Sequence, residues 1–283
     1  MKVALVPFVY GEMNYGGILQ FYALQKTVGA LGAECEILRA PDGEPGCPSA
    51  PQRDAAGPRG ALWSAALRCR AALIKWKTHR RLIKISEFKA HRYVKSVDLS
   101  DVDIRSYGSV VCGSDQIWNP GFARERTFLA FVPDDVNKVI YAASLAVDEL
   151  TERQQAAFRP LINRLEHVSV REISGKGLVE QASGRTDVQV VLDPTLLLTS
   201  EEWDDALGNP KPVVQGKYVL TYFLGEHAAY SKLATAWGRE HGCKVVNIPY
   251  ASGEHIDHHV FGDVRVYDAD PAEFVSLIKN AEC

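Results

Sequence analysis

The chain has 283 residues, of which 46% are apolar and 24% charged, and its formal net charge is −3. This composition is typical of a soluble globular protein with room for two domains of ordinary size. A net charge this close to zero provides no overall attraction to nucleic acid. The sequence has no apolar run of about eighteen residues and no signal-peptide pattern at its start, so we expect a cytoplasmic protein without a membrane span. The six cysteines are scattered without CxxC spacing, which predicts reduced thiols rather than metal ligands.

Predicted strands and helices alternate along the chain, which is typical of α/β proteins with parallel sheets. The first βαβ unit consists of a strand at Lys2–Val9, a helix at Ile18–Leu31 and a strand at Glu34–Leu38. Further strands are predicted at Ser109–Cys112, Val139–Ser144, Val168–Val170 and Val188–Leu192, and helices at Thr151–Leu165 and after the capping box Thr199-x-x-Glu202.

After the Pro-rich stretch Gly208–Pro212 the pattern restarts, with a strand at Tyr218–Leu224, a helix at His227–His241, a strand at Lys244–Ile248 and a helix at Pro271–Glu282. We therefore predict a first domain at 1–207, a linker at 208–216 and a second domain at 217–283. The second domain has only two clear strands, too few for a stable parallel sheet. Either a strand lies within Gly253–Asp268 or the chain is a fragment, and we favour the fragment.

The segment Arg59–Lys95 is strongly basic, with eleven Lys or Arg and one acid, Glu87. Apolar residues are interleaved with the cations, so the segment predicts an amphipathic helix, or a pair of them, inserted in the first domain. Such a helix can lie on an anionic membrane surface or meet a phosphate-rich acceptor. A solvated helix face is the alternative, and the residues do not decide between them.

Ligands of open parallel sheets bind at the carboxyl ends of the strands, where three predicted loops carry unusual residues. The first, Asn14-Tyr15-Gly16-Gly17, opens a helix but is not a GxGxxG dinucleotide motif. Its glycines either let free N–H groups approach an anion or merely form the turn.

The second loop is Gly113-Ser114-Asp115-Gln116-Ile117-Trp118-Asn119. Its carboxylate and amides suit sugar hydroxyls, and the indole suits the C–H face of a sugar ring. A helix cap with a core tryptophan is the other interpretation, and both stay open.

The third loop places Arg171 and Glu172 directly after a strand, where a guanidinium can bind a carboxylate or phosphate with two hydrogen bonds. A structural Arg171–Glu172 pair or a solvated loop is an equally good interpretation. Asp193-Pro194 favours a simple strand-ending turn. His255-x-x-His258-His259 could bring imidazoles together, but no helix or strand supports the spacing, so we predict no metal site.

Five blocks of the sequence, taken together, resemble the polysaccharide pyruvyl transferase family in their order and spacing over essentially the whole chain. They are Asn14-Tyr15-Gly16-Gly17-x-Leu19-Gln20-x-Tyr22-Ala23-Leu24, Gly113–Asn119, Tyr141-Ala142-Ala143-Ser144, Arg171-Glu172 and Asp193-Pro194. The resemblance implies a GT-B-like fold of two Rossmann-like, doubly wound domains. It also implies transfer of a pyruvyl group from phosphoenolpyruvate to two hydroxyls of a sugar, giving a ketal.

The acceptor that the resemblance implies is a cell-surface polysaccharide or its lipid-linked precursor, at the inner face of the membrane, and phosphoenolpyruvate is the donor substrate rather than a cofactor. Arg171 is then expected to bind the anionic donor, and Asp115 to orient or deprotonate the acceptor hydroxyl. The implied substrate-binding residues are Asn14, Tyr15, Gly16, Gly17, Gln20, Ser114, Gln116, Trp118, Asn119, Glu172 and Asp193.

The family continues, after a helix like Pro271–Glu282, into a strand and a Ser-Phe-His-Gly block whose histidine handles phosphoenolpyruvate. This sequence stops at Cys283, before that block, so we expect an incomplete donor site and an inactive fragment. Two alternatives stay open because fold does not fix function. They are a nucleotide-sugar glycosyltransferase and a catalytically inactive glycan-binding protein.

Overall fold

The computed structural model describes residues 1–8, 14–39, 61–121, 123–224, 228–250 and 261–283. Their contacts divide them into two compact units. With the gaps just named, unit 1 comprises residues 1–8, 16–39 and 92–200, and unit 2 comprises residues 14–15, 61–91 and 201–283.

Unit 1 is built on a seven-stranded sheet with the order β3-β2-β1-β4-β5-β6-β7, in which every pair is parallel. The strands are β1 Lys2–Val6, β2 Glu34–Arg39, β3 Ser96–Asp98, β4 Ser109–Cys112, β5 Asn137–Ala143, β6 His167–Val170 and β7 Gln189–Val190. The strand order reverses direction between β1 and β4, and this reversal is the topological switch point of the sheet.

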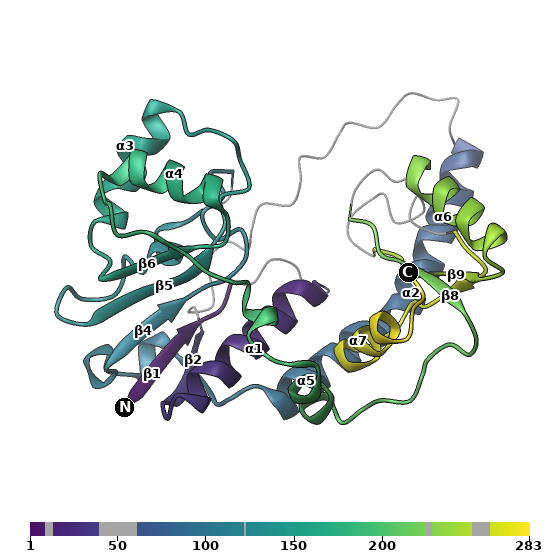
Figure 1. The fold of residues 1–283 in the computed structure, drawn as a ribbon, viewed down its shortest axis with the longest axis horizontal. Helices are drawn as coiled ribbons and strands as arrows, with labels where there is room; N and C mark the ends of the chain where they lie inside the picture. Colours follow the sequence, from purple (N-terminus) through teal and green to yellow (C-terminus); the bar gives the residue numbers. More distant parts are fainter. Residues whose placement is uncertain (9–13, 40–60, 122, 225–227, 251–260) are drawn as a thin grey trace. The chain divides into compact units, whose positions relative to one another are not determined.

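Both faces of this sheet are covered, as a parallel sheet requires. Alternate residues of β1 point to opposite faces, so Val3 and Leu5 pack with Phe21 and Leu24 of helix α1, Tyr15–Ala30. Ala4 and Val6 belong to the larger core on the other face. That core includes side chains of helices α3, Glu152–Ile162, and α4, Ile173–Ser183, and Figure 1 shows α1 on the face opposite α3 and α4.

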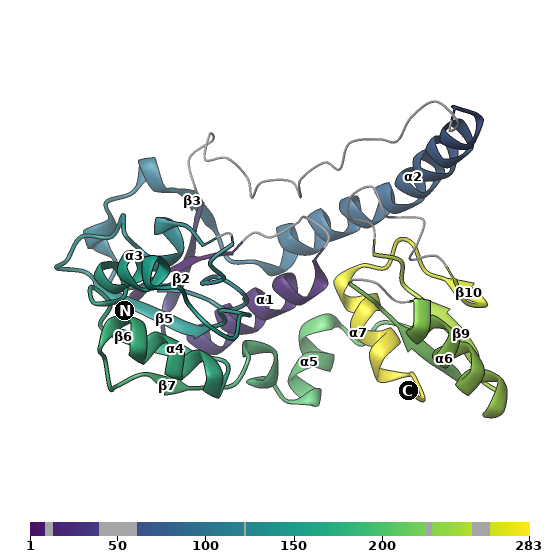
Figure 2. The ribbon, with the colours of Figure 1, turned by 90° about the horizontal axis from the view of Figure 1, so that it is seen from above.

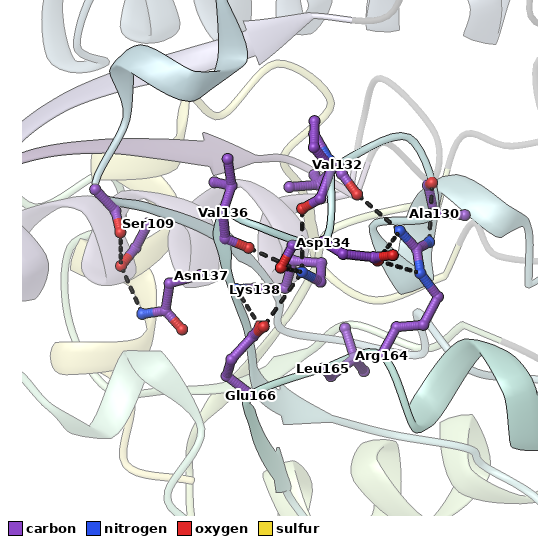
Figure 3. A network of polar contacts seen from close by, with 12 residues as sticks. Ser109, Ala130, Val132, Asp134, Val136, Asn137, Lys138, Arg164, Leu165 and Glu166 are labelled. Carbon is purple, nitrogen blue, oxygen red and sulfur yellow. Dashed lines mark hydrogen bonds and ion pairs between the residues drawn. The ribbon is translucent and has the colours of Figure 1, made fainter.

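Near the amino end of β5, a polar network fixes the turn that leads into the strand (Figure 3). The fully buried Lys138 donates from Nζ to the carbonyls of Pro133, 3.2 Å, and Val136, 2.8 Å, and pairs with Glu166 at 3.3 Å. A buried ammonium is tolerated only when it is paired and hydrogen-bonded. This lysine therefore has a structural role.

Unit 2 carries a smaller parallel sheet with the order β10-β9-β8. Its strands are β8 Tyr218–Thr221, β9 Lys244–Asn247 and β10 Val264–Arg265, and its helices are α2 Ala61–Arg92, α5 Ser200–Leu207, α6 Ala228–Glu240 and α7 Pro271–Lys279. The last residue of α2 and the first residue of α5 are assigned to unit 1. Figure 2 shows α6 beside β9. Strand β10 lies within Gly253–Asp268. This confirms the interpretation in which that region supplies a third strand. Beyond α7, the N–H of Glu282 donates to the Tyr218 carbonyl of β8.

Two successive units with parallel sheets confirm the α/β class and the Rossmann-like domains expected of a GT-B-like fold. The units divide the chain differently from the predicted domains 1–207 and 217–283. Residues 61–91 belong to unit 2 because Arg81 of α2 donates to the carbonyls of Pro249, Val266 and Tyr267.

The basic segment forms one helix of 32 residues rather than a pair. Lys279 of α7 bonds Asp204 of α5 at 2.6 Å, and the division between the units falls before Glu201 rather than in the predicted linker. Among the residues that the structure describes, no helix has both the length and the apolar character that a membrane crossing needs.

Candidate functional site

Gly17 of the predicted first loop and Gly113, Ser114 and Asp115 of the second lie at the switch point of the unit 1 sheet. A pocket between the ends of β1 and β4 is lined by Phe8, Gly17, Gln20, Phe21, Gly113, Ser114 and Asp115. Its volume of about 10 Å³ holds roughly one water molecule. Residues from the ends of both predicted loops therefore line one pocket, at the position where open parallel sheets bind ligands.

Among the described residues that line this pocket, Asp115 is the one with a side-chain carboxylate. Its backbone has a φ of 76°, which is uncommon for a residue other than glycine, and its carbonyl accepts the N–H of Ser144 at 2.9 Å. Among the described residues, no hydrogen bond or ion pair engages its half-buried carboxylate. This carboxylate is thus held in place by its backbone and left free to accept a proton or a hydroxyl.

Gly113 positions Asp115 through its lack of a side chain. A Cβ on Gly113 would lie 2.0 Å from the carbonyl oxygen of Tyr141, and its φ of 148° disfavours any other residue. The hydroxyl of the buried Ser114 donates to the Ala142 carbonyl at 2.8 Å. Backbone contact with β5 therefore fixes the start of the loop.

Trp118 does not have the sugar-stacking role that we expected. The side chain is fully buried, it stacks on Phe128 with ring centroids 5.0 Å apart, and its indole N–H donates to the Thr127 carbonyl at 3.1 Å. A buried indole with a satisfied donor belongs to the core. Gln116 and Asn119 are half-buried and bond each other at 3.3 Å, so the amides stay candidates for sugar contacts.

A second cluster joins Gln20 of α1 to the residues that follow β6 and β7. Gln20 donates from Nε2 to Oδ2 of Asp193, and Nη1 of Arg171 donates to the same oxygen at 3.0 Å. Oδ1 of Asp193 accepts the N–H of Thr195 at 3.0 Å and its hydroxyl at 2.7 Å. Asp193 is therefore occupied by protein donors, and its carboxylate orients Gln20 and Arg171 instead of contacting substrate as we expected.

Arg171 pairs with two carboxylates, Asp193 and Glu172, at 3.0 and 3.1 Å. Burial lowers the pKa of Arg171, but the hydrogen bonds to Asp193 and Glu172 outweigh burial and hold its pKa above the usual value. The structural Arg171–Glu172 pair is therefore present. The hydrogen bonds described for Arg171 use Nε and Nη1, so Nη2 is the part of the guanidinium left for a ligand.

Tyr141 is a site residue that sequence reasoning missed. Its hydroxyl donates to the Leu192 carbonyl at 3.1 Å, and burial together with the nearby Asp193 carboxylate raises its pKa. The phenol therefore keeps its proton near the Asp193 carboxylate. The resemblance had included Tyr141 in the Tyr-Ala-Ala-Ser block, which was the available signal.

Tyr15 belongs to unit 2 and lies outside the site in unit 1. It is fully buried, stacks on Phe274 at 4.3 Å, lies beneath the guanidinium of Arg81 at 5.5 Å and donates to the Ala269 carbonyl at 2.5 Å. These contacts make it a core residue rather than a substrate contact. Asn14 is half-buried, Gly16 is exposed, and their roles stay predictions.

The candidate metal-ligating histidines, His255, His258 and His259, lie outside the described residues. In the part of the chain that is described, no group of three His, Cys, Asp or Glu side chains is arranged to hold a metal ion.

Comparisons with known proteins agree with the blocks that meet at this site. The family model described as polysaccharide pyruvyl transferase matches residues 14–283. No curated protein matches the chain. Among solved structures, the E. coli ADP-heptose LPS heptosyltransferase II is similar at 13% identity and a TM-score of 0.37, over 100% of this chain and 77% of that one. A structural similarity of this size says nothing about activity, whereas the family match covers nearly the whole sequence. The chain belongs to the polysaccharide pyruvyl transferase family, and it is a transferase.

Proposed function

We propose that the protein transfers a pyruvyl group from phosphoenolpyruvate to two hydroxyls of one sugar, in a cell-surface polysaccharide or its lipid-linked precursor. The observation that carries the proposal is the free Asp115 carboxylate at the topological switch point, beside Gln20. The site presents hydrogen-bond acceptors to a hydroxyl, and family membership gives the class of group that is transferred.

The reaction has defined proton requirements. The methylene carbon of phosphoenolpyruvate gains a proton, a sugar hydroxyl adds to the neighbouring carbon, and the C–O bond to phosphate breaks. The second hydroxyl then closes the ketal and loses its proton, so the products are one ketal and one inorganic phosphate. A base must accept a hydroxyl proton, and a cation must bind the carboxylate or phosphate of the donor.

We assign the base to Asp115, because its carboxylate has no described protein partner. Arg171 is the proposed anion-binding residue, acting through Nη2, and Asp193 orients its guanidinium. Tyr141 keeps its proton near the Asp193 carboxylate, and its hydroxyl donates to the Leu192 carbonyl.

The test is an incubation of the full-length protein with phosphoenolpyruvate and methyl hexopyranosides. We expect release of inorganic phosphate in parallel with a new ketal methyl signal in the NMR spectrum of the sugar. Phosphate release without a sugar product, or turnover of a nucleotide sugar in place of phosphoenolpyruvate, would exclude the proposal.

We further propose that α2 contacts an anionic membrane surface, which would bring the protein to a lipid-linked acceptor. Leu73, Trp76 and Ile83 share one side of the helix and are 51%, 71% and 46% exposed, and His79 and Arg80 are exposed nearby. Apolar residues flanked by cations are typical of helices that lie in the interface of a bilayer.

Cosedimentation with phosphatidylglycerol vesicles should fall for Trp76→Ser and stay unchanged for Trp237→Ser on α6. Equal binding of both variants and the parent protein would refute this contact.

A further inference from the structure

The Gln20 side chain has one end occupied and one end free. It lies in the second turn of α1 with only 8% of its surface exposed, and its Nε2 donates to Asp193. Its Oε1 is buried and has no hydrogen-bond partner among the described residues. An unpartnered buried acceptor is costly, so it needs an explanation.

The orientation of the amide is fixed by chemistry. The Asp193 carboxylate, which also accepts from Arg171 and Thr195, can only accept hydrogen bonds, so the Gln20 group that faces it must be the NH₂ donor. The opposite end of the amide must then be the carbonyl oxygen. At its carbonyl end Gln20 can therefore offer only an acceptor to a neighbouring group.

The pocket that Gln20 lines has a matching chemistry. Asp115 lines the same pocket and contributes a second acceptor, and Gly17 contributes no side chain. A ligand with a carboxylate or phosphate at this point would meet two acceptors and be repelled. A hydroxyl of a ligand could donate to one of these acceptors, and two neighbouring hydroxyls of a sugar could donate to both.

We propose that Gln20 is a specificity-determining residue that accepts a hydrogen bond from a hydroxyl of the acceptor sugar, with Asp193 fixing its orientation. This inference rests on the proposed function and deepens it, because it assigns the β1–β4 pocket to the neutral sugar and the Arg171 side to the anionic donor. Asp193 connects the two, since one of its oxygens accepts from both Gln20 and Arg171.

Two substitutions separate this role from a merely structural one. Gln20→Lys keeps a donor for Asp193 and removes the acceptor, whereas Gln20→Met removes both. If Gln20 only holds Asp193, the lysine variant should bind sugar as well as the parent protein. If Oε1 accepts a sugar hydroxyl, both variants should be impaired. Gln189→Lys, at an exposed position of β7, controls for the added charge.

The probes are methyl β-galacto-, β-gluco- and β-mannopyranoside, with binding measured by saturation-transfer NMR and the fold checked by thermal unfolding. We expect at least one hexoside to bind the parent protein and the Gln189→Lys control. For both Gln20 variants we expect its affinity to fall at least about tenfold, because a hydroxyl is left unpaired in a buried site. Phosphoenolpyruvate affinity should change less than about twofold in Gln20→Met, because this substitution removes no hydrogen-bond partner of the donor under the inference.

Equal hexoside binding by Gln20→Lys and the parent protein, or no binding of any hexoside to the parent protein, would overturn the inference. A parallel ketal assay with the full-length protein keeps the two proposals apart. Gln20-dependent hexoside binding without ketal formation would refute the proposed function and leave the inference standing. Ketal formation with an unchanged hexoside KM in Gln20→Lys would refute the inference and leave the proposed function standing.

Discussion

Asp115 and Asp193 differ in the hydrogen bonding of their carboxylates. Asp193 accepts hydrogen bonds from Gln20, Arg171 and Thr195, whereas the Asp115 carboxylate has no partner among the described residues. A carboxylate that is already saturated orients its neighbours, and one that is held but unpartnered can act on a substrate. Under the proposed function, the chemistry of the site therefore depends on Asp115.

Asp115→Asn should remove the base while keeping the size of the side chain. We expect kcat to fall by about 10²–10⁴-fold, the range for losing a general base, with little change in thermal stability. The matched control is Asp148→Asn at an exposed position, which should keep full activity. Retention of most of the activity by Asp115→Asn would show that the base lies elsewhere.

Gly113→Ala tests the close approach that sets the Asp115 loop. The added Cβ would meet the Tyr141 carbonyl at 2.0 Å, so β4 and β5 would have to move apart. We expect a loss of about 1–3 kcal/mol in the free energy of unfolding, measured by urea denaturation. Gly177→Ala in α4 meets nothing within 4 Å and should be neutral or slightly stabilising. Equal stability of the two variants would contradict the observed geometry.

At the scale of elements, α2 is held to unit 2 by a buried cation. Arg81 is fully buried and donates to three backbone carbonyls, whereas its neighbour Arg80 is exposed and forms a 3.4 Å ion pair with Asp268. Arg81→Met should lower the free energy of unfolding by about 2–4 kcal/mol, because three carbonyls lose their donors. Arg80→Met should change it by less than about 0.5 kcal/mol. Similar losses in both, by chemical denaturation, would contradict this assignment.

Strand β2 depends on the charge of Glu36. Its carboxylate accepts from the hydroxyl of Tyr107 at 2.6 Å and pairs with Lys2 at 2.9 Å, and these hydrogen bonds lower its pKa. A lowered folded-state pKa contributes stability above the unfolded value of about 4.3, which is lost as the pH falls through the folded value. Glu36→Gln should therefore be less stable than the parent protein at neutral pH, and the difference should shrink below about pH 4. A difference that is constant with pH in thermal unfolding would argue against it.

Local sequence signals predicted most of these elements well. Strand β4 begins and ends as predicted, because four buried apolar or small residues precede a glycine, and α3 begins directly after Thr151, the predicted first residue, which caps it. Helix α4 was missed because Gly175 and Gly177 lower its helix propensity, and packing of Val179 and Ala182 in the core outweighs that penalty. The sequence could not show that Arg81 is buried, because its partners lie far along the chain.

Some features of the candidate site could likewise be predicted from the sequence, and others could not. That Asp115, Gly17 and Gln20 share a pocket follows from the rule for parallel sheets, so the sequence could predict it. The burial of Trp118 and Tyr15 could not be predicted, because an aromatic residue in a polar motif suits either a core or a sugar site. The saturation of Asp193 depends on Gln20, 173 positions away in the sequence, and only the fold reveals it.

At the scale of the whole molecule, a family match over residues 14–283 and a switch-point site with free acceptors agree with transfer to a sugar hydroxyl. The most direct test of this claim follows the full-length protein, and its Asp115→Asn variant, with phosphoenolpyruvate and the hexopyranosides by mass spectrometry. We predict a sugar product heavier by one pyruvate less one water, formed in step with inorganic phosphate and strongly reduced in the variant. Failure to form this product from any of the hexosides, or its formation at equal rates by both proteins, would contradict the account.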